Sequence, residues 1–200
     1  YEKSGLISRL DRYIWEQAAA KLGEWKKVGI NMSISVNISP KDFYYIDIFN
    51  TFAGLIKKYD IEPSNLKIEI TETTIMSDVP NLMGELEELR KAGFTIEMDD
   101  FGSGYSSLNT LKDINVDVLK VDMGFIKETK NVKKSRIILA SVIKMAKELN
   151  LLIIIEGVET EEQVDNLTKL GCDVFQGYYF SKAIDVNEFE KRYLYRKKAG

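Results

Sequence analysis

Residues 138–156, ILASVIKMAKELNLLIIIE, join a helical pattern directly to a strand pattern. In the first part, Leu139, Ile143 and Ala146 recur at the spacing of a helix with one apolar face. The second part, residues 151–155, is aliphatic throughout, which is typical of a strand covered on both faces. A helix that leads into such a strand, with no hairpin turn between them, predicts a crossover connection in a parallel sheet.

The same alternation of helix and strand patterns extends along the whole chain. The expected strands are residues 32–38, 66–71, 94–98, 116–121, 151–155 and 174–175. The first helix is expected to bury Leu6, Ile7, Leu10, Tyr13, Ile14, Ala18, Leu22 and Trp25. A second helix should begin at Ser39-Pro40 and run to about Tyr59, a third should run from about Asn81 to Gly93, and a last one should begin near Val186. Thr160 to Gln163 form a capping box at the start of a further helix.

Repeated β-α units predict the fold class, an α/β barrel of the TIM type. No glycine fingerprint or P-loop follows a strand, which disfavours an open nucleotide-binding sheet. Six strands are too few to close a barrel that normally has eight, and the chain opens on a helix. We therefore expect one domain, residues 1–200, whose barrel is incomplete at the N-terminus. Alone, such a chain should expose strand edges, associate with itself and be nearly inactive.

The composition restricts the chemistry. The sequence has no histidine, so the usual imidazole base and zinc ligand are absent. Its one cysteine, Cys172, is expected to be a buried, reduced thiol, which points weakly to a cytoplasmic location, with any membrane attachment residing in regions outside this chain. A net charge of −3 disfavours a nucleic acid polymer as partner.

Polar side chains stand where the expected strands end. In a parallel barrel these ends meet at one face, where active sites are built. Asp99-Asp100 is the strongest signal, because adjacent carboxylates repel each other and need a counter-charge. The full set is Asn37, Glu69, Glu72, Asp99, Asp100, Lys120, Asp122, Glu156, Glu159 and Gln176.

Seven carboxylates at one barrel mouth predict bound cations. Oxygen ligands from Asn, Asp and Glu suit Mg²⁺ or Mn²⁺. Two such ions, about 3.5 to 4 Å apart, would hold the attacking and leaving oxygens of a phosphoryl hydrolysis, and Lys120 would stabilise the phosphate charge. Any one of these side chains could instead begin a loop or cap a helix, so the prediction depends on their joint placement.

Six motifs resemble the EAL domain family in order and spacing. They are SVNIS (35–39), IEITET (68–73), DDFGSGYSSL (99–108), LKVD (119–122), EGVET (156–160) and GCDVFQGYYFSK (171–182). The segments GLISRLD (5–11) and AAAKLGEW (18–25) are similar to the first helix of that family. The resemblance covers nearly all of the chain. The glutamate-alanine-leucine motif that names the family is absent, and Met123-Gly124 stand where arginine and serine are usual.

The resemblance implies a phosphodiesterase that binds cyclic di-GMP and cuts it to linear pGpG with Mg²⁺ or Mn²⁺, while Ca²⁺ occupies the site without supporting turnover. The positions similar to metal ligands are Asn37, Glu69, Asp99, Asp100, Asp122 and Glu156. Glu156 is also similar to a general base, and Lys120 to a lysine that contacts water and phosphate. Glu72, which anchors the loop 102–107, Glu159 and Gln176 are similar to supporting residues. Gly102, Ser103, Gln176 and Gly177 are similar to substrate-binding positions.

The same resemblance implies partners. It implies a homodimer through the loop after Asp100, and sensory or diguanylate cyclase domains elsewhere in a longer protein. Two alternatives stay open: a receptor that binds cyclic di-GMP without cutting it, and a Mg²⁺-dependent lyase or racemase barrel with Lys120 as base. The presence of every expected acid after the first strand favours the phosphodiesterase over the receptor, and the Asp99-Asp100 pair disfavours the lyase.

Overall fold

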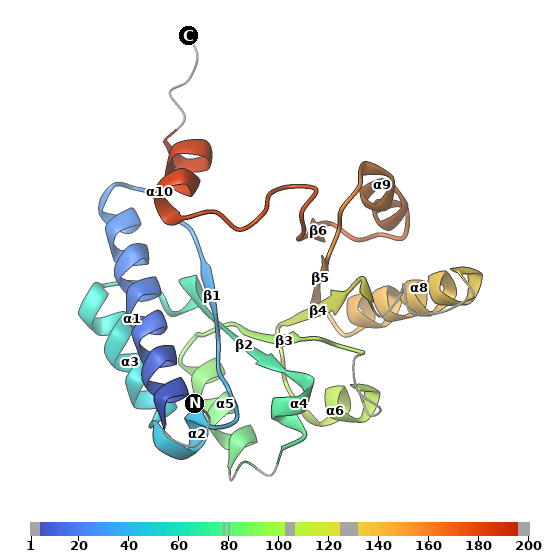
Figure 1. Ribbon diagram of the computed structural model, residues 1–200. Helices are drawn as coiled ribbons and strands as arrows, with labels where there is room; N and C mark the ends of the chain where they lie inside the picture. Colours follow the sequence, from blue (N-terminus) through green and yellow to red (C-terminus); the bar gives the residue numbers. More distant parts are fainter. Residues whose placement is uncertain (1–4, 78, 80, 103–106, 125–131, 196–200) are drawn as a thin grey trace.

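The fold is an open, curved parallel sheet with helices packed around it (Figure 1). The computed structural model of the chain describes residues 5–77, 79, 81–102, 107–124 and 132–195. The strands are β1 (Ile34–Asn37), β2 (Leu66–Thr71), β3 (Ile96–Asp99), β4 (Val118–Asp122), β5 (Leu152–Glu156) and β6 (Val174–Phe175). All are parallel, in the order β1-β2-β3-β4-β5-β6, so the six strands form a half-barrel, as the sequence predicted.

Helices connect successive strands and cover the outside of the sheet (Figure 1). They are α1 (Leu6–Lys27), α2 (Asp42–Tyr45), α3 (Ile48–Tyr59), α4 (Glu72–Ile75), α5 (Leu82–Lys91), α6 (Ser107–Asp113), α8 (Val132–Glu148), α9 (Glu161–Lys169) and α10 (Val186–Phe189). A 3₁₀ turn, Pro63–Asn65, precedes β2, and a π-helical turn, Glu190–Leu194, follows α10. None of the described helices combines the length and apolar character that a membrane crossing requires.

The two faces of the sheet differ in chemistry because side chains alternate along each strand. On β2, Leu66, Ile68 and Ile70 point to the helices and are fully buried. Lys67 and Glu69 alternate with them and point to the inside of the half-barrel, where they are partly exposed. On β2 the apolar side chains therefore pack between sheet and helices, and the polar side chains face the inside of the half-barrel.

The prediction for helix α1 is confirmed in its second half, where Ala18, Leu22 and Trp25 are buried, and wrong in its first half. Leu6, Leu10, Tyr13 and Ile14 were expected to be buried but are 43–60% exposed. Trp15 is instead fully buried. Its ring packs 5.0 Å from that of Phe52, and its Nε1 donates to the main-chain oxygen of Asn37 at 2.9 Å. Burial of this large ring decides which side of the helix faces the sheet.

The single helix expected from Ser39-Pro40 to Tyr59 is two helices, α2 and α3, so this prediction was wrong. Asp42, fully buried, accepts hydrogen bonds from both the main-chain nitrogen and the hydroxyl of Ser39 at 2.7 Å. Ile46 then adopts an extended conformation and ends α2. Asp47 caps α3 by accepting from the nitrogen of Asn50 at 3.0 Å. Local side-chain hydrogen bonds therefore interrupt the helical pattern.

Other boundaries confirm the sequence patterns. The Thr160 hydroxyl oxygen accepts a hydrogen bond from the main-chain nitrogen of Gln163 at 3.3 Å, and Gln163 Oε1 accepts one from the main-chain nitrogen of Thr160 at 3.0 Å. These two hydrogen bonds form the predicted capping box of α9. Cys172 is fully buried, and this burial raises the pKa of its thiol to about 11. The last helix, α10, begins at Val186 and packs on α1, where the Trp25 indole nitrogen donates to Glu190 at 2.8 Å.

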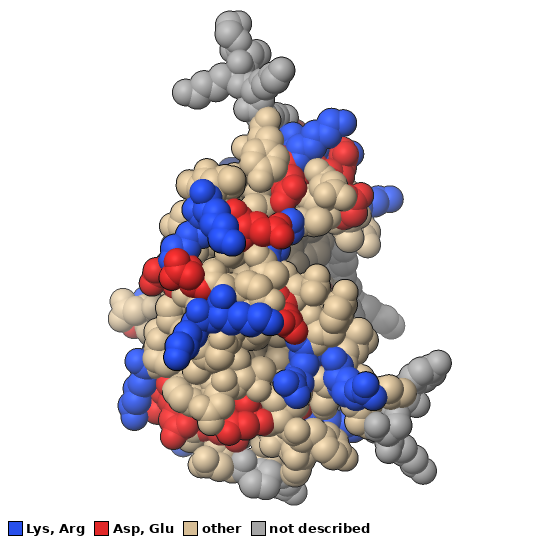
Figure 2. All heavy atoms as spheres, turned by 90° about the vertical axis from the view of Figure 1, so that its left-hand side faces the viewer, with Lys and Arg blue, Asp and Glu red and all other residues tan. Residues whose placement is uncertain are grey.

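The outer surface over α1 and α3 carries intermingled acidic and basic side chains (Figure 2). Lys58 pairs with Glu16, and Lys26 pairs with Asp60 at 3.3 Å. No field of one sign builds up on this face, which agrees with the low net charge.

Candidate active site

Polar side chains gather at the carboxyl ends of the strands, inside the half-barrel. The strand register places Asn37 beside Glu69, and Asp122 beside Glu156. Since strands in a parallel sheet all end at the same edge, side chains distant in sequence meet there. This edge of the sheet is therefore the candidate active site.

Lys120 is the centre of the group. It lies on β4, is 4% exposed, and points to the inside of the half-barrel. Its Nζ lies 2.8 Å from Oε1 of Glu69 on β2, 2.8 Å from Oε1 of Glu156 on β5, and 3.5 Å from Oδ1 of Asp99 on β3. One ammonium group thus holds three carboxylates that come from three other strands.

Burial and neighbouring charges both act on the pKa values of this site. Burial alone would lower the pKa of Lys120, but its hydrogen bonds to Glu156 and Glu69 raise that pKa above the ordinary value. The pKa of Glu69 and that of Glu156 are both raised, first by burial and then by neighbouring acids such as Asp99, although Lys120 opposes the rise. Asp100 behaves alike: burial, then Asp99, raises its pKa.

Glu156 turns a buried oxygen toward Lys120. Its Oε1 lies 2.8 Å from Lys120 Nζ, so this ammonium group is the cation that the buried oxygen faces. Three carboxylates share that one ammonium group, and such an excess of oxygen ligands fits a divalent cation.

The structure brings some predicted metal ligands together and leaves others apart. Glu69, Asp99 and Glu156 meet at Lys120. Asp100 has a left-handed backbone, with φ of 56°, and its nitrogen donates to Asp99 Oδ1 at 2.9 Å. Asp122 accepts from the nitrogen of Gly124. Among the described residues, no three carboxylates converge on one point as a bound metal ion would require, so the metal-ligand set stays a prediction.

Glu72 connects the site to the loop that follows β3. It is fully buried at the start of α4, and its Oε2 accepts from the nitrogen of Gly102 at 3.3 Å. This contact ties the end of β2 to the first part of the loop 102–107. Ser103, a predicted substrate-binding residue, lies outside the described residues.

The last predicted site residues follow β5 and β6. Gln176 is exposed, and its main chain pairs with Ile155 at 2.9 Å and Val158 at 3.1 Å. A Cβ on Gly177 would collide with the main chain of Val158, so only glycine allows this close approach. Glu159 begins the turn into α9, where its nitrogen donates to Gln163 at 2.7 Å. These segments follow the carboxyl ends of β5 and β6 and border the mouth of the half-barrel.

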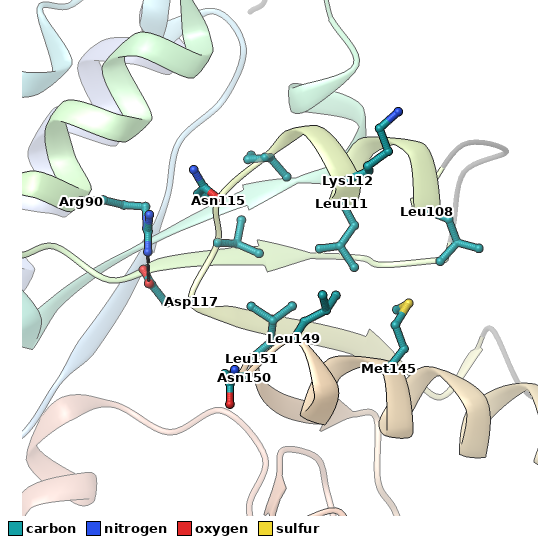
Figure 3. A pocket seen from close by; sticks show the side chains of 12 residues that line it. Arg90, Leu108, Leu111, Lys112, Asn115, Asp117, Met145, Leu149, Asn150 and Leu151 are labelled. Atoms are coloured by element: carbon teal, nitrogen blue, oxygen red, sulfur yellow. Dashed lines mark hydrogen bonds and ion pairs between the residues drawn. The ribbon is translucent and has the colours of Figure 1, made fainter.

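A cavity of 620 Å³ lies elsewhere, between α6 and α8 (Figure 3). Leu111, Met145 and Leu149 line it from the two helices. It sits at the amino ends of β4 and β5, the opposite edge from Lys120. Its main charged groups pair with each other, because Arg90 Nη2 lies 2.9 Å from Asp117 Oδ1. The cavity is thus not a part of the carboxylate site.

Comparison with known proteins decides the family. Residues 1–183 match the EAL domain. The chain belongs to the EAL domain family.

One relative within the family is a phosphodiesterase of Pseudomonas aeruginosa. The chain is 35% identical over 188 residues to the bifunctional diguanylate cyclase/cyclic di-GMP phosphodiesterase MucR of Pseudomonas aeruginosa, covering 94% of this chain and 27% of MucR. The chain thus spans about a quarter of the length of that relative. It superposes on the structure of the MucR phosphodiesterase in complex with c-di-GMP with a TM-score of 0.85 and 34% identity, covering 94% of this chain and 76% of the other.

A second similar structure is that of a relative in complex with calcium. The Klebsiella pneumoniae BlrP1 calcium/cy-diGMP complex matches with a TM-score of 0.77 and 29% identity, covering 88% of this chain and 44% of the other. The family, and the half-barrel architecture expected from the sequence, are therefore shown by similarity as well as by the fold.

Sequence reasoning missed three polar residues inside the half-barrel of this EAL domain. Glu97, 1% exposed, accepts from the hydroxyl of Ser35 at 2.9 Å and from Lys67 Nζ at 3.0 Å. The alternation in LKIEIT (66–71) was the available signal, because it puts Lys67 on the same strand face as Glu69. These three residues lie two positions before the strand-end residues Asn37, Glu69 and Asp99.

Proposed function

We propose that this EAL domain hydrolyses one phosphodiester bond of cyclic di-GMP to give linear pGpG, with Mg²⁺ or Mn²⁺ as cofactor. The observation that carries the proposal is the group of Glu69, Asp99 and Glu156 around the buried Lys120, at the carboxyl edge of a parallel half-barrel. Similarity to the MucR phosphodiesterase, whose structure holds c-di-GMP, supports the choice of substrate.

The acidic side chains suit a pair of divalent ions. The proposed ligands are Asn37, Glu69, Asp99, Asp100, Asp122 and Glu156, all at or next to the ends of β1 to β5. When bound, such ions polarise the phosphoryl group and make water a stronger nucleophile. The BlrP1 calcium complex supports a site that also accepts Ca²⁺, which we propose is inhibitory here.

Glu156 is the proposed general base. Burial raises the pKa of its carboxyl group, which makes its carboxylate a stronger proton acceptor than an exposed glutamate. Lys120, kept protonated by its acidic neighbours, would donate to the phosphate oxygens and stabilise the charge that develops on them. The two residues are 2.8 Å apart, so both can reach the same water and phosphate.

The mouth of the half-barrel supplies the proposed substrate contacts. Gly102, Ser103, Gln176 and Gly177 would border the dinucleotide, and Glu72 would hold the loop that begins at Gly102. We also propose that the loop after Asp100 forms part of a homodimer. MucR, of which this chain spans 27%, supports the presence of further signalling domains in a longer protein.

The test is release of pGpG from cyclic di-GMP, followed by chromatography, with Mg²⁺, Mn²⁺, Ca²⁺ or excess chelator. It is run on this chain and on this chain joined at its N-terminus to the residues of the MucR phosphodiesterase that precede the matched region. We expect turnover with Mg²⁺ or Mn²⁺ only, and mainly from the extended chain. Equal turnover in chelator would refute the metal requirement, and tight binding of cyclic di-GMP with no pGpG under any condition would favour a receptor instead.

Glu156→Gln tests the base. The change should keep the fold and lower turnover by about a hundredfold or more, the usual contribution of a general base. Glu148→Gln, at an exposed position of α8, is the matched control and should leave turnover unchanged. A Glu156→Gln rate within a few-fold of the parent, at equal metal loading, would remove Glu156 from the mechanism.

A further inference from the structure

A second charged group lies inside the half-barrel, next to the carboxylate site. Glu97 on β3 is 1% exposed, and each of its carboxylate oxygens has its own donor. Oε1 accepts from Lys67 Nζ on β2 at 3.0 Å, and Oε2 accepts from the hydroxyl of Ser35 on β1 at 2.9 Å. The proposed reaction uses none of these three side chains.

The placement of this group follows the strands of the site. Ser35, Lys67 and Glu97 precede Asn37, Glu69 and Asp99 by two residues, so each lies on the same strand face as one proposed ligand. The register also makes Glu97 the direct neighbour of Glu69 on the adjacent strand. Two acids side by side on one sheet face repel each other unless each has its own cation.

Each of the two neighbouring acids has a separate cation. Glu69 pairs with Lys120 at 2.8 Å, whereas Glu97 pairs with Lys67 at 3.0 Å. Lys67 and Glu97 therefore form an ion pair with no net charge, whereas Lys120 alone faces three carboxylates in the neighbouring site.

We propose that Lys67 and Ser35 hold Glu97 in a closed, neutral pair, which keeps Glu69 available to Lys120 and to a divalent cation. Lys67 and Glu97 are then positioning residues, which act on the cation through Glu69 without contacting it. The inference rests on the proposed function, because it assumes that Glu69 serves a metal site.

Breaking the pair from either side has a defined consequence. In Glu97→Gln, Lys67 keeps its charge and is free to pair with Glu69, two residues along the same strand face, so it competes with the metal ion. In Lys67→Met, the Glu97 carboxylate has no cation beside Glu69, and its negative charge attracts a metal ion. Glu97→Gln should therefore weaken Mn²⁺ binding by about 10- to 100-fold, the usual effect of altering a group that orients a metal ligand, whereas Lys67→Met should bind Mn²⁺ at least as tightly as the parent.

The double change Lys67→Met/Glu97→Gln removes both charges and restores neutrality. We expect its Mn²⁺ dissociation constant to return to within about threefold of the parent, which would show that the weakening in Glu97→Gln comes from the uncompensated charge of Lys67 and not from the loss of Glu97 itself. The matched control is Lys58→Met/Glu16→Gln, which removes an ion pair on the outer surface and should leave Mn²⁺ binding unchanged.

The experiment is a Mn²⁺ titration of the folded chain, followed by electron paramagnetic resonance well below the unfolding temperature, together with a thermal melt of each variant. A purely structural pair would lower the melting temperature and leave the dissociation constant alone. A crystal structure of Glu97→Gln should also show Lys67 Nζ in contact with Glu69.

The outcomes separate the two proposals. A parent chain that binds no Mn²⁺ overturns the proposed function, and this inference with it. A parent that binds Mn²⁺, with Glu97→Gln within about threefold of it, overturns this inference alone. If a single variant does not fold, the double variant decides, because Mn²⁺ binding weakened about tenfold or more there would show that charge neutrality is not what matters.

Discussion

Lys120→Met is the most informative perturbation of the site. Methionine has a similar length but no charge, so the change removes the ammonium group and little volume. Three carboxylates, on Glu69, Asp99 and Glu156, then lose the cation that they face at 2.8 to 3.5 Å. Their side chains are only 12–16% exposed, so water replaces that cation poorly.

The size of the effect follows from this burial. Removing one partner of a buried ion pair usually costs about 3 to 5 kcal/mol. A chain of this length loses about 2 to 4 °C of melting temperature for each kcal/mol, so the expected drop is about 6 to 20 °C. An exposed pair offers a contrast: Lys58→Met should cost less than about 1 kcal/mol.

The effect should depend on pH. Burial already raises the pKa of Glu69 and of Glu156, and Lys120→Met removes the contact that opposes this rise. A carboxyl group whose folded pKa is raised stabilises the fold below its unfolded pKa, and that contribution is lost as the pH rises through the folded pKa. The deficit of the variant should therefore be small near pH 4 to 5 and large above about pH 7.

The assay is thermal unfolding of the parent, Lys120→Met and Lys58→Met by circular dichroism, at acidic and at neutral pH. Saturating Mn²⁺ at neutral pH should restore part of the loss, because a ligand that binds only the folded state stabilises it. A deficit equal at both pH values, or a melting temperature within about 2 °C of the parent at neutral pH, would show that Lys120 is not the counter-charge of this site.

Three further predictions concern other parts of the fold. Glu72→Ala removes the acceptor for the Gly102 nitrogen, so hydrogen exchange over 102–107 should rise and turnover should fall; unchanged exchange would contradict the anchoring role. Thr160→Ala removes the capping box of α9 and should cost about 1 kcal/mol in a denaturant titration, against no change for Thr168→Ala inside the same helix beyond its propensity. Joining about forty residues that carry a further β-α unit to the N-terminus should pair the free edge of β1; a short chain that is already monodisperse and equally active would refute this.

Part of this structure could be predicted from local sequence patterns. The bounds of β2 were expected as observed, because LKIEIT alternates cleanly and ends where Thr71 caps α4. The capping box at Thr160 was also readable, since it depends on residues three positions apart. The meeting of Glu69, Asp99 and Glu156 followed from parallel topology alone.

The rest depended on contacts that no local pattern contains. Helix α1 has apolar residues on more than one side, and burial of Trp15 against Phe52 decided which side faces inward. Asp42 turned back to Ser39 and divided one expected helix into two. Glu97 was overlooked because a buried acid in mid-strand is uncommon, and only its partners on β1 and β2 make it stable there.

The order of the strands has a consequence for folding during synthesis on the ribosome. Each strand pairs with the strand that precedes it in the chain, so the sheet can grow one unit at a time during synthesis. Glu69 and Asp99 emerge before Lys120, and Glu156 emerges after it. A nascent sheet of three strands therefore carries two acids that lack the Lys120 ammonium group which they face in the complete fold. The docking of β4 brings Lys120 to Glu69 and Asp99 and so ends the repulsion between them. Before that step, a solvent cation could bind between these two acids instead.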